Sequence, residues 1–373
     1  MKKVWLICFS GLLCLSACTA SKQEDMKKER SSTIQNVAYK TKQSNKTPVT
    51  TIGYIEPFNE QKAIAEVKKN ARHLSYTAIF SYQVKQDGSL IAVKDEKLIK
   101  EIKKQGSLPM FVLTNFENGT FSPSIAHALF TNQQAMNTVI SQVLTTMKNK
   151  RYAAINVDFE HIKPEDKTRY NTFLHKLLSK AKANGYVTST ALAPKTSGTQ
   201  SGPWYTAHDY KTHGQLADYV VLMTYEWGWS GGPPMAVAPI TEVRKVLEYA
   251  LSEIPRTKII LGAPLYGYDW PLPYKKGNPF AKRISPEGAA QLAIDQKIPL
   301  QYDARVDAPY FYYRDATGKK HVVWFENEAS MQAKYNLVKE KGIRGVAYWV
   351  LGEPFARNWS LVEDRFSINR GTK

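Results

Sequence analysis

Short apolar segments alternate with longer amphipathic stretches along most of the chain. Apolar runs of roughly four to eight residues between turn-forming residues are typical of buried strands, and apolar residues at helical spacing predict helices. The expected strands are Val49–Ile55, Ala78–Tyr82, Leu108–Thr114, Ala153–Glu160, Val187–Ala193, Tyr219–Tyr225, Lys258–Leu265 and Gly345–Leu351. The clearest expected helices are Asn132–Lys148, Pro164–Asn184 and Thr241–Glu253.

Strands that alternate with helices favour a parallel (β/α)8 TIM barrel, an α/β fold, and a doubly wound open sheet is the alternative on pattern alone. One connection is much longer than the others, because an interval of about sixty residues, from Tyr266 to about Glu326, is included between the last two expected strands. This interval contains an expected helix, Ser285–Lys297, and two alternating strands, Ala308–Arg314 and His321–Phe325, joined by a turn at residues 316–318. We interpret residues 267 to about 326 as a small α+β module inserted into the barrel.

The N-terminus has the pattern of a secretory signal, with a basic start, the short apolar run Val4–Leu15 and small residues after it. Leu15-Ser16-Ala17-Cys18 resembles the bacterial lipobox, which implies removal of residues 1–17 and a diacylglycerol group on Cys18; an ordinary signal peptide is the alternative. Residues 18–48 are polar and predict a flexible tether, and the folded domain is expected over 49–373. The protein should therefore lie outside the cytoplasm, lipid-anchored to the cell membrane.

The amino-acid composition limits the kinds of ligand and binding partner that we expect. All three cysteines lie within the first 18 residues, so no disulfide or thiolate metal site is expected in the folded domain. The net charge of +18 favours anionic partners such as wall polymers or acidic lipid. Nucleic acid is not expected, because the lysines are scattered and no recognition motif is present. The seven histidines show no ligand-like spacing and there is no phosphate loop, so we expect no metal and no cofactor. We also expect a monomer.

The candidate chemistry lies in the strand Ile155–Glu160. Side chains alternate along a strand, so Asn156, Asp158 and Glu160 share one face and the apolar residues between them share the other. In a barrel the apolar face packs on the helices, and Glu160 reaches the C-terminal mouth, where barrel active sites lie. Two carboxylates buried together have pKa values that are pushed apart, which suits general acid catalysis. The alternative is a surface strand whose acids face water.

This strand resembles the Asp-x-x-Asp-x-Asp-x-Glu signature of the family 18 glycoside hydrolases, the chitinase-like barrels. Three further motifs of that family occur in order, namely Met223-Thr224-Tyr225, Gly262-Ala263-Pro264-Leu265-Tyr266-Gly267 and Gly345-Val346-Ala347-Tyr348-Trp349. The insertion that contains Val322–Glu326 is similar to the chitinase insertion domain. The resemblance runs from about residue 49 to the end of the chain, and it implies a barrel that hydrolyses glycans carrying N-acetyl groups.

Residues 223–239 resemble the spore-cortex-lytic branch of that family, N-acetylglucosaminidases that act on peptidoglycan fragments. Members of that branch usually carry LysM repeats before the barrel, whereas this chain has the lipobox and tether there. The resemblance implies cleavage of β-1,4 bonds after N-acetylglucosamine in peptidoglycan or spore-cortex fragments. A chitinase acting on chito-oligosaccharides is the alternative. A non-catalytic glycan-binding lectin on the same barrel is a third reading, which the presence of Glu160 disfavours.

The resemblance also implies a mechanism in which the substrate's own 2-acetamido oxygen is the nucleophile and configuration is retained. Glu160 would protonate the leaving oxygen and later activate water, and Asp158 would bond the acetamide N–H and stabilise positive charge. Tyr225 would hold the acetamide oxygen in line. Trp349 would form the floor under the distorted sugar.

The first two acids of the signature are replaced here by Ala153 and Asn156. We expect Asn156 to donate a hydrogen bond to Asp158 without taking a proton from it. Asp158 should then stay more firmly ionised than in a site with three acids, and the pH optimum should be shifted.

Strand ends supply secondary candidates, of which we expect about half to contact sugar. The secondary candidates for substrate binding are Asn156, Glu56, Asn115, Glu226, Trp227, Tyr266, Tyr268, Asp269 and Trp270.

Overall fold

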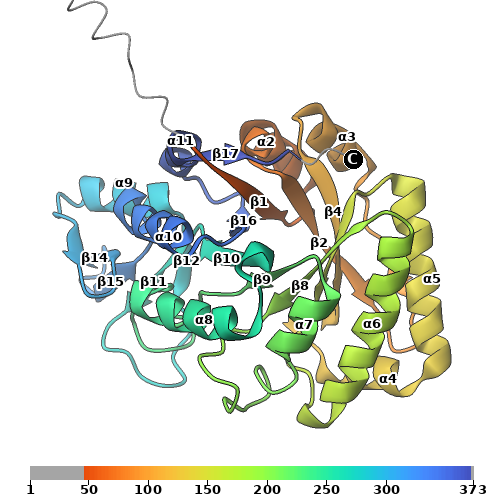
Figure 1. The fold of residues 1–373 in the computed structure, drawn as a ribbon. Coiled ribbons are helices and arrows are strands. Elements are labelled where there is room, and N and C mark those ends of the chain that lie inside the picture. The colour runs from red at the N-terminus through yellow and green to blue at the C-terminus, as the bar shows by residue number, and fades with distance from the viewer. Residues whose placement is uncertain (1–45, 371–373) are drawn as a thin grey trace, which may run out of the picture. The chain divides into compact units, whose positions relative to one another are not determined.

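The computed structural model describes residues 46–370, and eight parallel strands form the centre of this part of the chain (Figure 1). They are β1 (Thr47–Ile55), β2 (Tyr76–Val84), β4 (Leu108–Thr114), β7 (Ala154–Asp158), β8 (Val187–Leu192), β9 (Tyr219–Leu222), β10 (Ile259–Pro264) and β16 (Gly345–Leu351). Each is parallel to its neighbours, and β1 pairs with both β2 and β16. The sheet is therefore closed, which confirms the predicted (β/α)8 barrel and excludes the open sheet.

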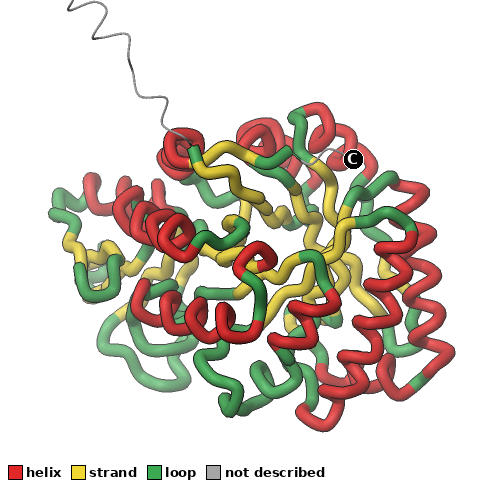
Figure 2. Tube along the Cα trace, in the orientation of Figure 1, coloured by secondary structure: helices red, strands yellow, loops and turns green. Residues whose placement is uncertain are grey.

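Helices follow the strands and cover the outside of the barrel (Figure 2). They are α2 (Glu60–Asn70), α3 (Glu96–Lys104), α4 (Pro123–Thr131), α5 (Gln133–Lys150), α6 (Lys167–Ala183), α7 (Tyr210–Leu216), α8 (Ile240–Glu253), α10 (Glu328–Lys341) and α11 (Ala356–Arg365). The three helices named from the sequence correspond to α5, α6 and α8. The side chain of Asn132 starts α5 by accepting hydrogen bonds from two backbone N–H groups of its first turn.

Several shorter elements lie between and beside these strands and helices. They are the 3₁₀ turns η1 (Ala71–His73), η2 (Pro164–Asp166) and η3 (Arg256–Lys258), the edge strands β3 (Leu90–Ile91) and β17 (Phe366–Ile368), and the hairpin of β5 (Phe116–Glu117) with β6 (Thr120–Phe121). The hairpin follows β4 directly and therefore stands at the C-terminal end of the barrel.

Apolar side chains fill two layers of the barrel. Ile155, Val157 and Phe159 belong to the layer between strands and helices, as alternation along the strand predicts. Inside the barrel a smaller apolar cluster includes Ile52 and Val112. β7 ends at Asp158, two residues before the predicted end of this strand, so Phe159 and Glu160 lie in the turn that follows. The polar residues of β7 thus point into the barrel and toward its mouth.

Between β10 and β16 the chain forms a second, antiparallel sheet with one helix packed on it. Its elements are β11 (Gly267–Pro271), β12 (Lys282–Ile284), α9 (Pro286–Asp295), β13 (Gln301–Asp303), β14 (Ala308–Arg314) and β15 (Lys320–Trp324), and the strand order is β12-β11-β15-β14-β13. The expected helix and the two expected strands occur as α9, β14 and β15. The short strands β12 and β13 were not predicted, because three residues are too few for an alternating pattern.

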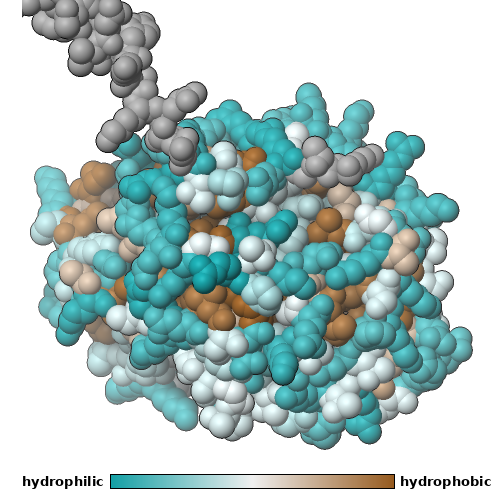
Figure 3. Space-filling model, viewed as in Figure 1, coloured by the Kyte–Doolittle hydropathy of each residue, from teal (hydrophilic) through white to brown (hydrophobic). Residues whose placement is uncertain are grey.

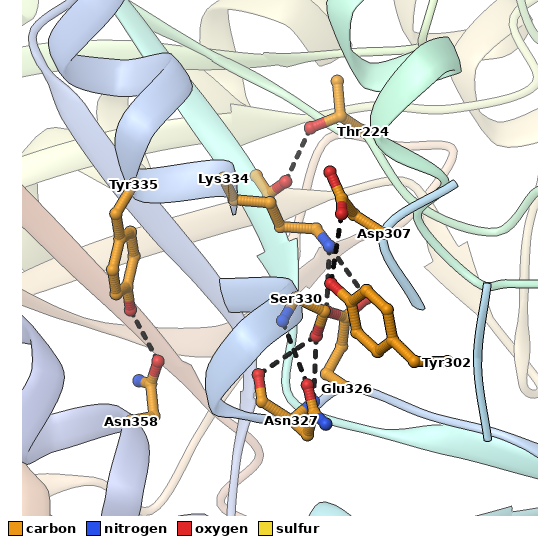
Figure 4. A network of polar contacts seen from close by, with 10 residues as sticks. Thr224, Tyr302, Asp307, Glu326, Asn327, Ser330, Lys334, Tyr335 and Asn358 are labelled. Carbon is orange, nitrogen blue, oxygen red and sulfur yellow. Dashed lines mark hydrogen bonds and ion pairs between the residues drawn. The ribbon is translucent and has the colours of Figure 1, made fainter. Parts of the chain in front are cut away.

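A buried ion pair stands at the start of α10, where the chain returns from this sheet to the barrel (Figure 4). Lys334 Nζ lies 2.8 Å from Glu326 Oε2, and both side chains are fully buried. The hydroxyl of Ser330 donates to the same Glu326 oxygen, and Ser330 and Asn327 form a capping box at the first turn of α10. Because each charge has a partner, the pair can be buried here without an unpaired ion.

The predicted signal peptide (1–17), the lipidated Cys18 and all but the last residues of the predicted tether lie outside the described residues. Thr47 and Pro48, which were assigned to the tether, belong to β1. Within residues 46–370 no helix is long and apolar enough to cross a membrane. The face of the domain drawn in Figure 3 is mainly hydrophilic, as expected for helices whose outer sides meet water.

Candidate active site

A pocket of about 270 Å³ opens at the C-terminal ends of the barrel strands. Parallel strands deliver their last side chains to one end of the barrel, which is why residues far apart in sequence meet there. The lining residues are Glu56, Phe80, Phe116, Phe121, Asp158, Glu160, Trp204, Met223, Tyr225, Glu226, Tyr266, Tyr268, Arg283 and Trp349. Eight of the predicted site residues therefore line one pocket: Glu56, Asp158, Glu160, Tyr225, Glu226, Tyr266, Tyr268 and Trp349.

Asp158 and Glu160 both line the pocket and are 6% and 9% exposed. Burial raises the pKa of Asp158 to about 7. Burial also raises the pKa of Glu160 well above its ordinary value, with Asp158 and Glu226 adding to the rise and a hydrogen bond from Trp204 opposing it. A carboxyl group that keeps its proton near neutral pH is what general acid catalysis requires.

Asp158 differs from the expectation in two ways. Asn156 does not bond to it, because Nδ2 of Asn156 donates to Ser189 Oγ at 2.9 Å and Oδ1 accepts from the hydroxyl of Tyr54 at 3.2 Å. Burial raises the pKa of Asp158, which does not favour the ionised form that we expected, while the comparison with a site of three acids stays a prediction. Asn156 is fully buried inside the barrel and does not line the pocket, so its assignment to substrate binding is corrected. Oδ1 of Asp158 is buried and has no hydrogen-bond partner among the described residues.

Asn115 was expected to contact sugar, and this is also corrected. Its side chain is fully buried and holds the backbone of Glu160. Nδ2 donates to the Glu160 carbonyl at 2.9 Å, and Oδ1 accepts from the Glu160 N–H at 3.0 Å. Nδ2 also donates to the carbonyl of Ser122 at 3.0 Å. The backbone pairing between β4 and β7 stops at Thr114 and Asp158, before Glu160. The side chain of Asn115 therefore supplies to the Glu160 backbone the hydrogen bonds that a neighbouring strand would otherwise supply.

Tyr225 and Glu226 lie in the loop after β9, which ends at Leu222, and both line the pocket. Glu226 has a positive φ of 69° and accepts hydrogen bonds from the hydroxyls of Tyr266 and Tyr268. Burial raises the pKa of Glu226, while these two hydroxyls oppose the rise. Gly262 on β10 allows the close approach of β9, because a Cβ there would lie 2.3 Å from the Leu222 carbonyl and 3.0 Å from the Tyr225 ring. Close packing of β9 against β10 therefore explains why glycine occupies position 262.

Three other predicted residues do not reach the pocket. Trp227 packs against the main core, and its backbone N–H bonds to Val237. Asp269 accepts from Tyr313 at 2.6 Å and pairs with His321 at 2.8 Å, inside the antiparallel module. Trp270 is buried and donates to the Gly232 carbonyl at 3.1 Å. Trp227, Asp269 and Trp270 therefore do not line the pocket, and nothing in the structure supports a direct contact of these residues with sugar.

The aromatic floor and walls are built from several elements. Trp349, at the end of β16, contacts the rings of Phe80 and Tyr54, with centroid distances of 4.8 and 5.7 Å. Phe116 and Phe121 from the β5–β6 hairpin pack edge to face at 5.2 Å on the wall. Flat rings that surround paired carboxylates form a site that fits a sugar ring, whose C–H faces pack on aromatic side chains.

Sequence reasoning did not assign six of the lining residues to the site. Phe80 lies in β2 and Met223 lies just after β9, whereas the other four lie in loops or short strands: Phe116, Phe121, Trp204 and Arg283. Arg283, on β12, stacks its guanidinium over the Tyr266 ring at 4.5 Å and pairs with Glu353 at 3.1 Å. Arg283 lowers the pKa of Glu56, which burial raises. No periodic pattern or motif marks the four positions in loops or short strands, and only their aromatic or cationic character could have suggested them.

Three larger hollows, of about 320, 530 and 730 Å³, lie elsewhere on the described domain. The hollow of about 730 Å³ is lined by the first residues of β4 and β8 and therefore lies at the N-terminal end of the barrel. None of the three contains a buried pair of carboxylates. Within residues 46–370 no cluster of three or more His, Cys, Asp or Glu side chains could hold a metal ion. Chemistry rather than size identifies the site.

A (β/α)8 barrel with a buried aspartate–glutamate pair in an aromatic pocket at its C-terminal end defines a barrel glycosidase. The chain belongs to Glycosyl hydrolases family 18, whose sequence model matches residues 36–353.

The similarity of the chain to known proteins and solved structures supports this family assignment. The chain is 41% identical to the cortical fragment-lytic enzyme of Bacillus subtilis (strain 168), over 88% of this chain and 77% of that protein. It is 44% identical to the spore cortex-lytic enzyme SleL of Bacillus megaterium QM B1551, whose crystal structure superposes with a TM-score of 0.85 over 88% of this chain and 76% of that chain. A chitinase from Chromobacterium violaceum, 24% identical with a TM-score of 0.77 over 84% of this chain and 98% of that chain, shares the fold.

Proposed function

We propose that this glycosidase cleaves β-1,4 bonds after N-acetylglucosamine in fragments of spore-cortex peptidoglycan. The observation that carries the proposal is the buried pair Asp158 and Glu160 beneath an aromatic pocket. The identity of 41–44% with a cortical fragment-lytic enzyme and a spore cortex-lytic enzyme supports cortex as the source of the glycan.

The reaction we propose uses the substrate's acetamide as nucleophile. Glu160 gives its proton to the glycosidic oxygen, the bond from this oxygen to C1 breaks, and the acetamide carbonyl oxygen bonds to C1. Glu160 then takes a proton from water as the water oxygen attacks C1 and reopens the ring. The buried Oδ1 of Asp158, which has no protein partner among the described residues, is suited to accept the acetamide N–H. Tyr225 is suited to donate to the acetamide oxygen, and Trp349 to support the sugar ring.

Digestion of purified spore cortex, vegetative peptidoglycan and chitin oligomers tests this proposal, with products identified by mass spectrometry. Wild type and the exposed control variant Glu165→Gln should release fragments with N-acetylglucosamine at the reducing end from cortex. Glu160→Gln should be slower by on the order of 10²–10⁴-fold, because it cannot transfer a proton. Equal product from Glu160→Gln would remove Glu160 from the mechanism. Cleavage of chitin oligomers alone would favour a chitinase, and binding without products a lectin.

We also propose that the enzyme is exported and attached to the cell membrane by a lipid on Cys18. The supporting observation is the sequence Leu15-Ser16-Ala17-Cys18 after a short apolar run. Cys18→Ser should move the protein from the membrane fraction to the medium, whereas the control variant Cys14→Ser should stay with the membrane. A Cys18→Ser protein that remains in the membrane fraction would contradict the anchor.

A further inference from the structure

The side chain of Trp204 makes a direct contact with the proposed acid. Trp204 lies in the loop between β8 and α7, half-buried, and lines the pocket. Its indole Nε1–H donates to Oε2 of Glu160, with 2.5 Å between the two atoms. This is the only side-chain hydrogen bond of the Glu160 carboxyl within the described residues, because Asn115 bonds to the Glu160 backbone instead.

The indole is held in place from both sides of Glu160. Its ring stacks on the imidazole of His161 at a centroid distance of 6.1 Å and an interplanar angle of 16°. Further along the same loop, His208 bonds to the Phe159 carbonyl through Nε2 at 3.0 Å and accepts the Ala193 N–H at 2.6 Å. The loop that carries Trp204 is therefore tied to the residues immediately before and after Glu160. An indole fixed in this way keeps its N–H directed at one carboxyl oxygen.

We propose that Trp204 is a positioning residue that gives the two oxygens of Glu160 different tasks, an inference that rests on the function proposed above. Oε2 is held as a hydrogen-bond acceptor, and Oε1 carries the proton that goes to the glycosidic oxygen. The chemical reason is that an indole N–H can donate a hydrogen bond but cannot accept one. In the protonated acid the carbonyl oxygen is the better acceptor, so the proton belongs on the oxygen that Trp204 does not contact.

Trp204 and the other groups around Glu160 have opposite effects on the pKa of this carboxyl group. Asp158 on β7 and Glu226 after β9 raise the pKa of Glu160, and burial raises it most, whereas the bond from Trp204 lowers it. Burial raises the pKa of the Tyr170 and Tyr225 phenols, and the charges of Asp158 and Glu160 add to the rise, so both phenols stay neutral. Burial lowers the pKa of His161, so the ring stacked on Trp204 is neutral near pH 7. Among residues 46–370, Trp204 is thus the one side chain whose hydrogen bond stabilises the Glu160 carboxylate that is needed to activate water.

Removal of the indole N–H should therefore change the pH dependence of catalysis. The value of kcat/KM falls as pH rises through the pKa of the general acid. In Trp204→Phe the carboxylate loses a charge-assisted hydrogen bond, so the pKa rises and this basic limb should move to higher pH by about one unit. The ratio of kcat/KM in the variant to that in wild type should then rise about tenfold from the acidic to the basic side of the limb. A side chain with a purely structural role would lower the rate by the same factor at every pH.

The test compares wild type, Trp204→Phe and the neighbouring control Tyr205→Phe on an N-acetylated chito-oligosaccharide and on its 4-methylumbelliferyl glycoside. The control should keep the wild-type pH profile. The loss in Trp204→Phe below the limb should be larger for the oligosaccharide, because a phenol leaving group needs less protonation. A basic limb that stays in place, with equal losses for both substrates, would overturn the proposal.

A second measurement decides the matter if Trp204→Phe does not fold. In wild type the NMR signal of the Trp204 indole N–H should titrate with the midpoint of the basic limb, since it bonds to the group that ionises. An indole signal that does not change across this limb would refute the contact. An enzyme that cleaves no N-acetylated glycan would defeat the proposed function instead, while the indole titration would still report on Trp204.

Discussion

Replacement of Asn115 by alanine tests how the barrel positions its acid. The substitution removes three hydrogen bonds at once: two to the backbone of Glu160 and one to the carbonyl of Ser122. It leaves the buried backbone N–H and carbonyl of Glu160 without these partners. No side chain of the pocket is altered, so the variant separates the position of Glu160 from its chemistry.

The size of the effect follows from these contacts. Three hydrogen bonds at a net value of about 1 kcal/mol each give a loss of roughly 3 kcal/mol in the free energy of unfolding. In a domain of this size such a loss lowers Tm by about 5 °C. A displacement of the acid by about 1 Å costs roughly a hundredfold in rate, so kcat should fall about a hundredfold while KM changes little.

Calorimetry and steady-state kinetics on an N-acetylated oligosaccharide measure the two effects. Asn137→Ala, on the exposed side of α5, serves as the matched control and should change neither quantity. An Asn115→Ala enzyme with wild-type kcat would refute the view that Asn115 positions Glu160, even if its Tm fell. An unchanged Tm as well would show that the three hydrogen bonds contribute nothing to stability.

Three further variants extend the account. Burial raises the pKa of Asp158 to about 7 from 3.8, so between these pH values the folded protein holds a proton that the unfolded chain releases, and the free energy of unfolding falls as pH rises through this window. Asp158→Asn should therefore be inactive yet gain stability relative to wild type between pH 5 and pH 8. Urea unfolding that shows no such gain would contradict the pKa shift. Lys334→Met should lower the free energy of unfolding in urea by about 3–5 kcal/mol, because it leaves Glu326 buried without its partner. The double variant with Glu326→Leu should recover most of this loss. A single variant as stable as wild type would be inconsistent with the buried pair. Tyr225→Phe should lose about a hundredfold in kcat with little change in Tm, since only a hydroxyl aimed at the acetamide is removed, and an unchanged kcat would exclude that role.

Strand positions and the central acids could be predicted because periodicity reports burial directly. The apolar faces of β7 and its neighbours alternate, and this pattern places Asp158 and Glu160 toward the mouth without further information. The residues at the other strand ends could not be assigned in the same way. A polar side chain after a strand either faces the pocket, as Glu226 does, or holds backbone, as Asn115 does, and the sequence is alike in both cases.

The orientation of Asp269 follows from the alternation of side chains along its strand. In the antiparallel strand β11 Tyr268 lines the pocket, so its neighbour Asp269 must point to the opposite face, where it meets His321. Trp204 and Arg283 differ from this case. They come from a loop and a three-residue strand, where no period exists. The fold of the barrel loops brings Trp204 beside Glu160, and the antiparallel pairing of β12 with β11 brings Arg283 beside Tyr266.

The central claim is that the nucleophile belongs to the substrate and that the pocket serves to hold it. Two oligosaccharides that differ only in the N-acetyl group on the sugar at the scissile bond test this claim directly. Wild type should cleave the acetylated compound and leave the deacetylated one intact over the same period, because the amine offers no carbonyl oxygen to attack C1. Cleavage of both compounds at equal rates would contradict substrate assistance and would require a nucleophile on the protein or in water.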